Sequence, residues 1–154
     1  MRAYKIITKV IISSYTELSE QEKKLIDIAK NAAKDAYAPY SQFKVGSAVL
    51  LENGEMITGN NQENIAYPSG ICAERVALYY ANATFPGIKV EAIAVAAYSG
   101  GDYTGKISPC GSCRQVLQEA ENRYKSPIRI LLYGKNEIYI VESVKDLLPL
   151  SFSF

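Results

Sequence analysis

The chain has 154 residues, of which 48% are hydrophobic and 21% charged. This composition is typical of a globular domain, and the length suits one domain and is too short for two. Its 17 basic and 16 acidic residues nearly cancel, and no run of lysine or arginine could follow a phosphate backbone. This favours a small, uncharged substrate over a polynucleotide. Polar residues at Lys5, Thr8 and Lys9 interrupt the apolar start, so we expect no signal peptide, no membrane span and a cytoplasmic location.

Hydrophobic periodicity and turn residues predict strands and helices along the whole chain. Ser19 and Glu22 form a capping box ahead of a run with helical spacing, and Asn53-Gly54 is a strong hairpin signal between two strand-like runs. The apolar run over 90–98 is typical of a strand covered on both faces. The expected elements are a strand over 4–12, a helix over 20–37, strands over 43–51 and 55–59, a helix over 72–83, a strand over 90–98, a helix over 109–123, strands over 128–133 and 137–141, and a helical turn over 144–148.

Helices alternate with strands after the first hairpin, which is the pattern of an α/β fold. We therefore expect a three-layer α/β/α sandwich around a mixed, five-stranded sheet. Residues 1–154 are expected to form a single domain, in which residues 1–18 are a strand-like N-terminal extension at a sheet edge. No internal repeat or low-complexity linker divides the chain.

The three cysteines stand in two motifs, Cys-Ala-Glu at 72–74 and Pro-Cys-Gly-Ser-Cys at 109–113, in a chain without histidine. A zinc site that activates water keeps three protein ligands and one open position, and Cys72, Cys110 and Cys113 meet that count. Both motifs lie at expected helix starts, where free N–H groups and the helix dipole lower the pKa of a thiol. We therefore expect one Zn²⁺ per chain rather than a disulfide framework.

Glu74 is the expected proton shuttle. Because the chain has no histidine, acid–base chemistry near neutral pH must fall to a carboxylate or a lysine. The two motifs match the all-cysteine form of the zinc deaminase signature, in which the glutamate is the acid/base. In the expected mechanism Glu74 takes a proton from the zinc-bound water and passes it to the ring nitrogen beside the reacting carbon. The hydroxide attacks that carbon, and the same carboxyl protonates the departing ammonia.

Three thiolates leave the zinc centre with a net negative charge, which weakens the metal as a Lewis acid. Arg75 and Arg114 directly follow the two motifs, and we expect both to donate hydrogen bonds to the sulfurs. The alternative is that both are ordinary helix-surface residues. The cysteines have alternatives too, a redox pair or a closed structural site, although closure would need a carboxylate as the fourth ligand.

The segments 40–50, 59–75 and 107–117 resemble the small, three-cysteine cytidine deaminases, and the resemblance runs from about Leu18 to the C-terminus. It implies hydrolysis of cytidine and 2′-deoxycytidine to uridine and 2′-deoxyuridine in pyrimidine salvage, by a homotetramer. Gln62, Asn60 and a longer stretch over 99–106 depart from the family pattern, which affects substrate detail more than chemistry.

The resemblance also implies which residues contact the substrate. Some of these contacts would come from neighbouring subunits, which would make assembly a requirement for activity. The residues concerned are Asn61 and Glu63 at the ribose 3′-hydroxyl, Phe43 beside base and sugar, the backbone of Ala73 at the base, and Tyr67 and Phe152 reaching a neighbour's site.

Two other functions remain open at this point. A deaminase of a modified cytosine nucleoside would keep the same zinc and proton-shuttle residues. A non-catalytic, zinc-stabilised oligomer would use the metal only for folding free energy. Deaminases that act on nucleic acid are disfavoured, because they usually carry His-Ala-Glu and need a basic surface.

Overall fold

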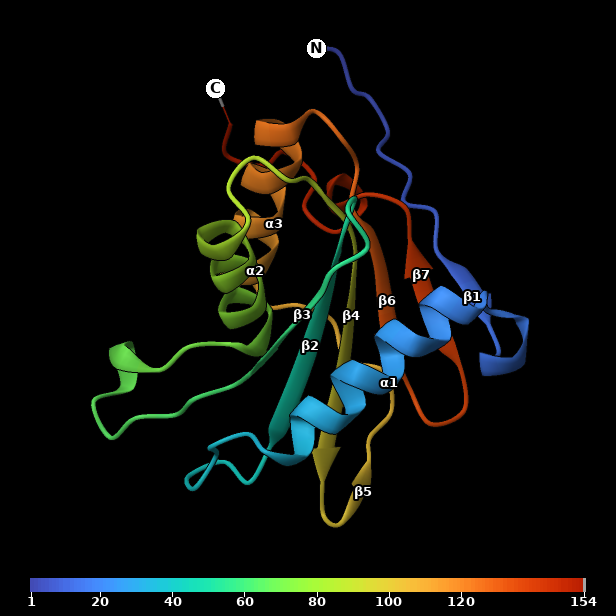
Figure 1. Ribbon diagram of the computed structural model, residues 1–154. Helices are drawn as coiled ribbons and strands as arrows, with labels where there is room; N and C mark the ends of the chain where they lie inside the picture. Colours follow the sequence, from blue (N-terminus) through green and yellow to red (C-terminus); the bar gives the residue numbers. More distant parts are fainter. Residues whose placement is uncertain (154) are drawn as a thin grey trace.

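The computed structural model describes residues 1–153, and its helices pack on both faces of one sheet (Figure 1). None of the helices in this range combines the length and the hydropathy that a bilayer-spanning segment needs. The elements are the helices α1 (Glu20–Lys34), α2 (Ala73–Thr84) and α3 (Gly111–Tyr124), the strands β1 (Ile11–Ser13), β2 (Lys44–Leu51), β3 (Met56–Asn60), β4 (Val90–Ser99), β5 (Asp102–Tyr103), β6 (Arg129–Tyr133) and β7 (Ile138–Val141), and 3₁₀ turns at Tyr15–Glu17, Tyr67–Ser69 and Val144–Asp146.

The sheet has the strand order β1-β7-β6-β4-β2-β3, and β5 pairs with β4. The β4–β6 pair is parallel and the other pairs are antiparallel, so the sheet is mixed, as predicted. It has seven strands instead of the five expected. Beyond those five, the described residues add β1, at the edge where the N-terminal extension was expected, and the short β5, which was not expected and lies in the stretch that departs from the family pattern.

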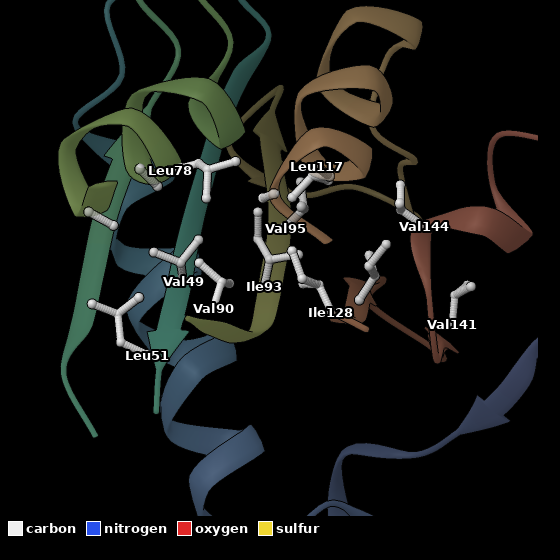
Figure 2. Close-up of a cluster of buried hydrophobic side chains, with 14 of the residues drawn as sticks. Val49, Leu51, Leu78, Val90, Ile93, Val95, Leu117, Ile128, Val141 and Val144 are labelled. Carbon is white, nitrogen blue, oxygen red and sulfur yellow. The ribbon is translucent and has the colours of Figure 1, made fainter. Parts of the chain in front are cut away.

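The three layers follow from the alternation of side chains along the strands. On β4, Ile93 packs with Leu78 of α2 and Leu117 of α3, whereas the next residue, Ala94, packs with Leu25 of α1 on the opposite face. Figure 2 shows the first of these clusters between the sheet and the pair α2 and α3. The sheet is therefore covered by α1 on one face and by α2 and α3 on the other, which confirms the predicted α/β/α arrangement.

Gly46 and Gly59 allow two of the helices to lie directly against the sheet. A Cβ on Gly46 would lie 2.1 Å from the carbonyl oxygen of Ala29 in α1, and one on Gly59 would lie 2.4 Å from the amide nitrogen of Ala77 in α2. Both distances are far shorter than a van der Waals contact, so any side chain would push the helix away. Gly59 thereby sets the position of α2, which begins at the first cysteine motif.

The N-terminal strand predicted over 4–12 is mostly wrong. Only Ile11–Ser13 pairs, antiparallel to β7 with Ile11 opposite Ile140. If the pairing continued toward the N-terminus in the same register, it would run past the end of β7 at Val141. Residues 4–9 therefore have no residue of β7 beside them. They form no regular secondary structure, and the hydroxyl of Thr8 donates to the carbonyl of Asp146 at 2.9 Å.

The helix predicted over 20–37 begins at the expected residue and ends early. Its capping box forms, because the Glu22 amide donates to the Ser19 hydroxyl and the Ser19 amide donates to the Glu22 carboxylate. The helix ends at Lys34, since the Tyr37 amide donates to the carbonyl of Asn61 at 3.1 Å instead of continuing the helical ladder. This contact brings the end of α1 beside the segment that follows β3.

Candidate zinc and substrate site

The three thiols meet where two helices begin. Cys72 is the N-cap residue of α2, Cys110 is the N-cap residue of α3, and Cys113 lies in the first turn of α3. The sulfur of Cys72 lies 3.8 Å from that of Cys110, which lies 3.5 Å from that of Cys113. All three sulfurs lie within 4.8 Å of one another. Cysteine motifs far apart in the sequence therefore form one cluster.

This cluster fits zinc. With Zn–S bonds of about 2.3 Å and tetrahedral angles, thiolate sulfurs around one ion lie about 3.8 Å apart, close to the spacing found here. No carboxylate joins the cluster among the described residues, and the chain has no histidine that could complete it. Three ligands with an open fourth position match a site for activating water, not a closed structural site.

The electrostatics of the cluster favour a thiolate at Cys72. Hydrogen bonding from Cys113, and then from Arg75 and Cys110, lowers the pKa of Cys72 to about 5 against the opposing effect of burial. The Arg75 guanidinium donates to the Cys72 sulfur at 3.7 Å, as the sequence led us to expect. Its Nε atom is buried without a hydrogen-bond partner among the described residues.

Arg114 is placed differently from the sequence-based expectation. Its guanidinium donates to the carbonyl oxygens of Pro109 and Leu147 and to the hydroxyl of Ser108, and it forms no hydrogen bond to a cysteine sulfur in the described part of the chain. The expected bond to sulfur is therefore wrong. The backbone carbonyl oxygens of Pro109 and Leu147 offer this charged donor stronger acceptors than a sulfur does.

Glu74, the second residue of α2, is only 5% exposed and lines the cleft beside the thiols. Burial raises the pKa of Glu74, because water no longer solvates its charged form, and the nearby Cys72 thiolate adds to this effect. The backbone amide of Glu74 acts in the opposite direction and lowers that pKa. A carboxyl that retains its proton to higher pH than usual is suited to both accepting and donating a proton near neutral pH.

The cleft that contains these groups has a volume of about 910 Å³, within the range of small-molecule sites. Its walls come from the segments 40–45, 61–71 and 107–110 and the start of α2. Phe43, Asn61, Glu63, Tyr67 and Ala73 all line it. Phe152 does not line it among the described residues, and the structure places its side chain largely in solvent, 71% exposed.

Asn61 and Glu63 bind the chain's own backbone. The Asn61 side chain accepts from the Val45 amide at 2.7 Å and donates to the Phe43 carbonyl at 3.0 Å. The Glu63 carboxylate accepts from the Tyr40 amide at 2.9 Å and from the amide and hydroxyl of Ser41. These bonds, chiefly that from the Ser41 side chain, lower the pKa of Glu63.

The two side chains therefore fix the loop that carries Phe43. The cleft is also lined by residues that were not predicted as site residues, among them Ser41, Ile71, Ile107 and Ser108. Their only signal was a position inside the segments that resemble the family.

Known proteins resemble the chain over most of its length. Residues 19–125 match the family model of the cytidine and deoxycytidylate deaminase zinc-binding region. The cytidine deaminase of Sporosarcina psychrophila is 42% identical over 132 residues, covering 85% of this chain and 90% of the relative. The cytidine deaminase of Mycobacterium tuberculosis is 36% identical over 129 residues, covering 80% and 84% of the two chains.

Solved structures agree with the sequence matches. The crystal structure of cytidine deaminase from Burkholderia pseudomallei superposes with a TM-score of 0.73 at 39% identity, covering 88% of this chain and all of that one. That of the Mycobacterium tuberculosis enzyme gives a TM-score of 0.68 at 33% identity over 86% of this chain. With the fold, the three-thiol cluster and a family model that spans most of the sequence in agreement, the chain belongs to the cytidine deaminase family.

Proposed function

We propose that the chain catalyses the hydrolytic deamination of cytidine and 2′-deoxycytidine, so that water replaces the exocyclic amine and ammonia leaves. The observation that carries this proposal is the placement of the buried Glu74 carboxyl and the three-thiol cluster at one cleft. The names of the relatives at 36–46% identity support the choice of substrate.

The proton transfers belong to Glu74. Cys72, Cys110 and Cys113 would hold the zinc ion, which would supply the Lewis acid that makes water nucleophilic near neutral pH. The Glu74 carboxylate accepts a proton from the attacking water and donates it to the ring nitrogen beside the reacting carbon. It then accepts the second proton, from the hydroxyl now bound to that carbon, and donates it to the amine, which leaves as ammonia. Its burial supports this cycle, because a raised pKa lies closer to the pH at which both protonation states are needed.

The sugar is proposed to bind at Asn61 and Glu63, with Phe43 beside base and sugar and the backbone of Ala73 at the base. The carboxylate of Glu63 accepts three hydrogen bonds within the chain and has about four acceptor positions. The Asn61 amide also has one donor hydrogen and one acceptor position beyond those it uses. Together they can bind a sugar hydroxyl without releasing the loop.

We further propose a homotetramer in which Tyr67 and Phe152 complete the site of a neighbouring subunit. Both side chains are largely exposed, at 92% and 71%, as expected of aromatic residues that a second copy would cover. Sedimentation equilibrium is expected to give four times the chain mass of 17.0 kDa. A fully active monomer would contradict shared sites.

We propose that residues 1–154 form one domain and that the enzyme works in the cytoplasm in pyrimidine salvage. The support is the continuous sheet, which joins both ends of the chain through β1 and β7, and the nucleosides on which the named relatives act.

Ultraviolet-monitored turnover with zinc measured in the same sample tests the function. We expect cytidine and 2′-deoxycytidine to be converted to uridine and 2′-deoxyuridine by protein that carries about one zinc per chain. Protein that binds zinc but converts neither nucleoside would contradict the proposal. The remaining candidates would then be a modified cytosine nucleoside as substrate or a structural role for the metal.

A further inference from the structure

Arg114 joins two segments that lie far apart in the sequence. Its Nε donates to the carbonyl of Pro109 at 2.8 Å and its Nη2 to the hydroxyl of Ser108 at 3.0 Å. Its Nη1 donates to the carbonyl of Leu147, 33 residues away, at 2.7 Å. The planar guanidinium presents donors in fixed directions, so three short bonds hold both segments in one arrangement.

The first of these segments sets the direction of a zinc ligand. Pro109 is buried, and its carbonyl belongs to the peptide group that leads into Cys110. Cys110 is exposed and lies before the first turn of α3, so the loop that precedes it determines where its sulfur points. Unlike Cys113, which lies inside α3, Cys110 therefore depends on a support outside its helix.

The second segment is the C-terminal one. Leu147 follows the 3₁₀ turn at Val144–Asp146, and the chain then returns to α3, where the Gln115 amide donates to the carbonyl of Phe152 at 2.9 Å. Adjacent residues of α3 thus bind both ends of the C-terminal segment. The same helix turn contains Cys113.

We propose that Arg114 is a positioning residue that orients Cys110 for zinc and couples zinc affinity to the order of the C-terminal segment. The inference rests on the zinc site of the proposed function and adds to it a residue that touches neither metal nor substrate. Its partners are backbone carbonyls and a serine hydroxyl, so it acts through the loop and not through the charge of the sulfurs.

Zinc affinity, measured by competition with a chromogenic chelator, tests the positioning role. Partners that orient metal ligands are typically worth about 10- to 100-fold in affinity, so Arg114→Ala is expected to bind zinc weaker by that factor. The zinc affinity of Arg114→Lys is expected to lie between those of Arg114→Ala and the wild type, because an ammonium cannot donate in three fixed directions. Arg129→Ala is the matched control, since that guanidinium pairs with Glu22 and Glu142 away from the cleft. Affinity of Arg114→Ala within twofold of wild type would overturn the proposal.

The visible spectrum of the cobalt(II)-substituted protein separates positioning from a general loss of stability. Its absorption bands depend on the arrangement of the sulfurs around the metal, which thermal destabilisation elsewhere does not change. Arg114→Lys is the milder variant and serves here in case Arg114→Ala does not fold. We expect altered absorption bands in Arg114→Lys and unchanged bands in Arg129→Ala. Identical spectra for Arg114→Lys and wild type would overturn the proposed orientation of Cys110.

Trypsin cleavage after Lys145, which is exposed beside the segment that Arg114 holds, tests the coupling. Because linkage is reciprocal, zinc is expected to slow this cleavage in the wild type and to slow it less in Arg114→Lys. Equal protection by zinc in both proteins would overturn the coupling. None of these measurements needs substrate, so wild-type protein that binds zinc but leaves cytidine unchanged would contradict the proposed function and leave this inference intact.

Discussion

Glu74→Gln is expected to lower the rate of cytidine deamination by at least about 100-fold while the chain stays folded and retains zinc. The amide has nearly the shape of the carboxyl, so the buried site at the start of α2 keeps its packing. It cannot exchange protons with water, ring nitrogen and amine. Turnover, zinc content and thermal unfolding of the same preparation measure the three parts of this expectation.

Glu119→Gln is the matched control for that substitution. Glu119 is exposed on α3 and does not line the cleft among the described residues, so the same chemical change there is expected to leave turnover unaltered. A Glu74→Gln enzyme with a near-normal rate would contradict the proton-shuttle role. Loss of zinc together with loss of the fold would instead identify Glu74 as a structural ligand.

The sequence predicts the metal cluster well because its signals are local. Cys72 and Glu74 are two residues apart, Cys110 and Cys113 are three apart, and each pair stands at a helix start that turn residues already indicate. Once two such helices pack on the same face of a sheet, their N-terminal ends can meet. The family resemblance supplied the expectation that they do.

The contacts of Arg114 and Asn61 were not predictable in the same way. Arg114 was expected at a sulfur because it follows Cys113, yet one of its acceptors lies 33 residues away. Asn61 was assigned to the sugar by resemblance, and its bonds to the backbone of residues 43 and 45 depend on how β3 pairs with β2. Neither choice of acceptor leaves a pattern in the sequence.

Boundaries of elements depend on long-range pairing for the same reason. The helical spacing of α1 continues to Tyr37, but its amide finds a partner at Asn61, and the helix ends earlier. The strand β5 is short, and its Tyr103 is held by rings from elsewhere, with centroids 5.3 Å from Tyr98 and 5.8 Å from Tyr133. A two-residue strand has too few residues for periodicity to indicate it.

Replacing Cys113 by serine is expected to abolish both zinc retention and turnover. Cys113 is 1% exposed, so serine fits the space, but a neutral hydroxyl is a poor zinc ligand at neutral pH. Loss of a direct ligand is expected to weaken zinc binding by more than the roughly 100-fold typical of an outer partner. Zinc per chain after dialysis against a weak chelator, and turnover in the same sample, measure the effect.

Thermal unfolding with and without added zinc compares metal binding in the wild type, Glu74→Gln and Cys113→Ser. A metal that binds only the folded state raises the unfolding temperature, so zinc is expected to stabilise the wild type and Glu74→Gln but not Cys113→Ser. Ser112→Ala, a change of the neighbouring exposed hydroxyl, is the control and is expected to behave as wild type. A Cys113→Ser chain that holds one zinc as tightly as the wild type would contradict the three-thiolate site. The two substitutions together separate proton transfer from metal binding, because only the cysteine change removes both zinc and activity.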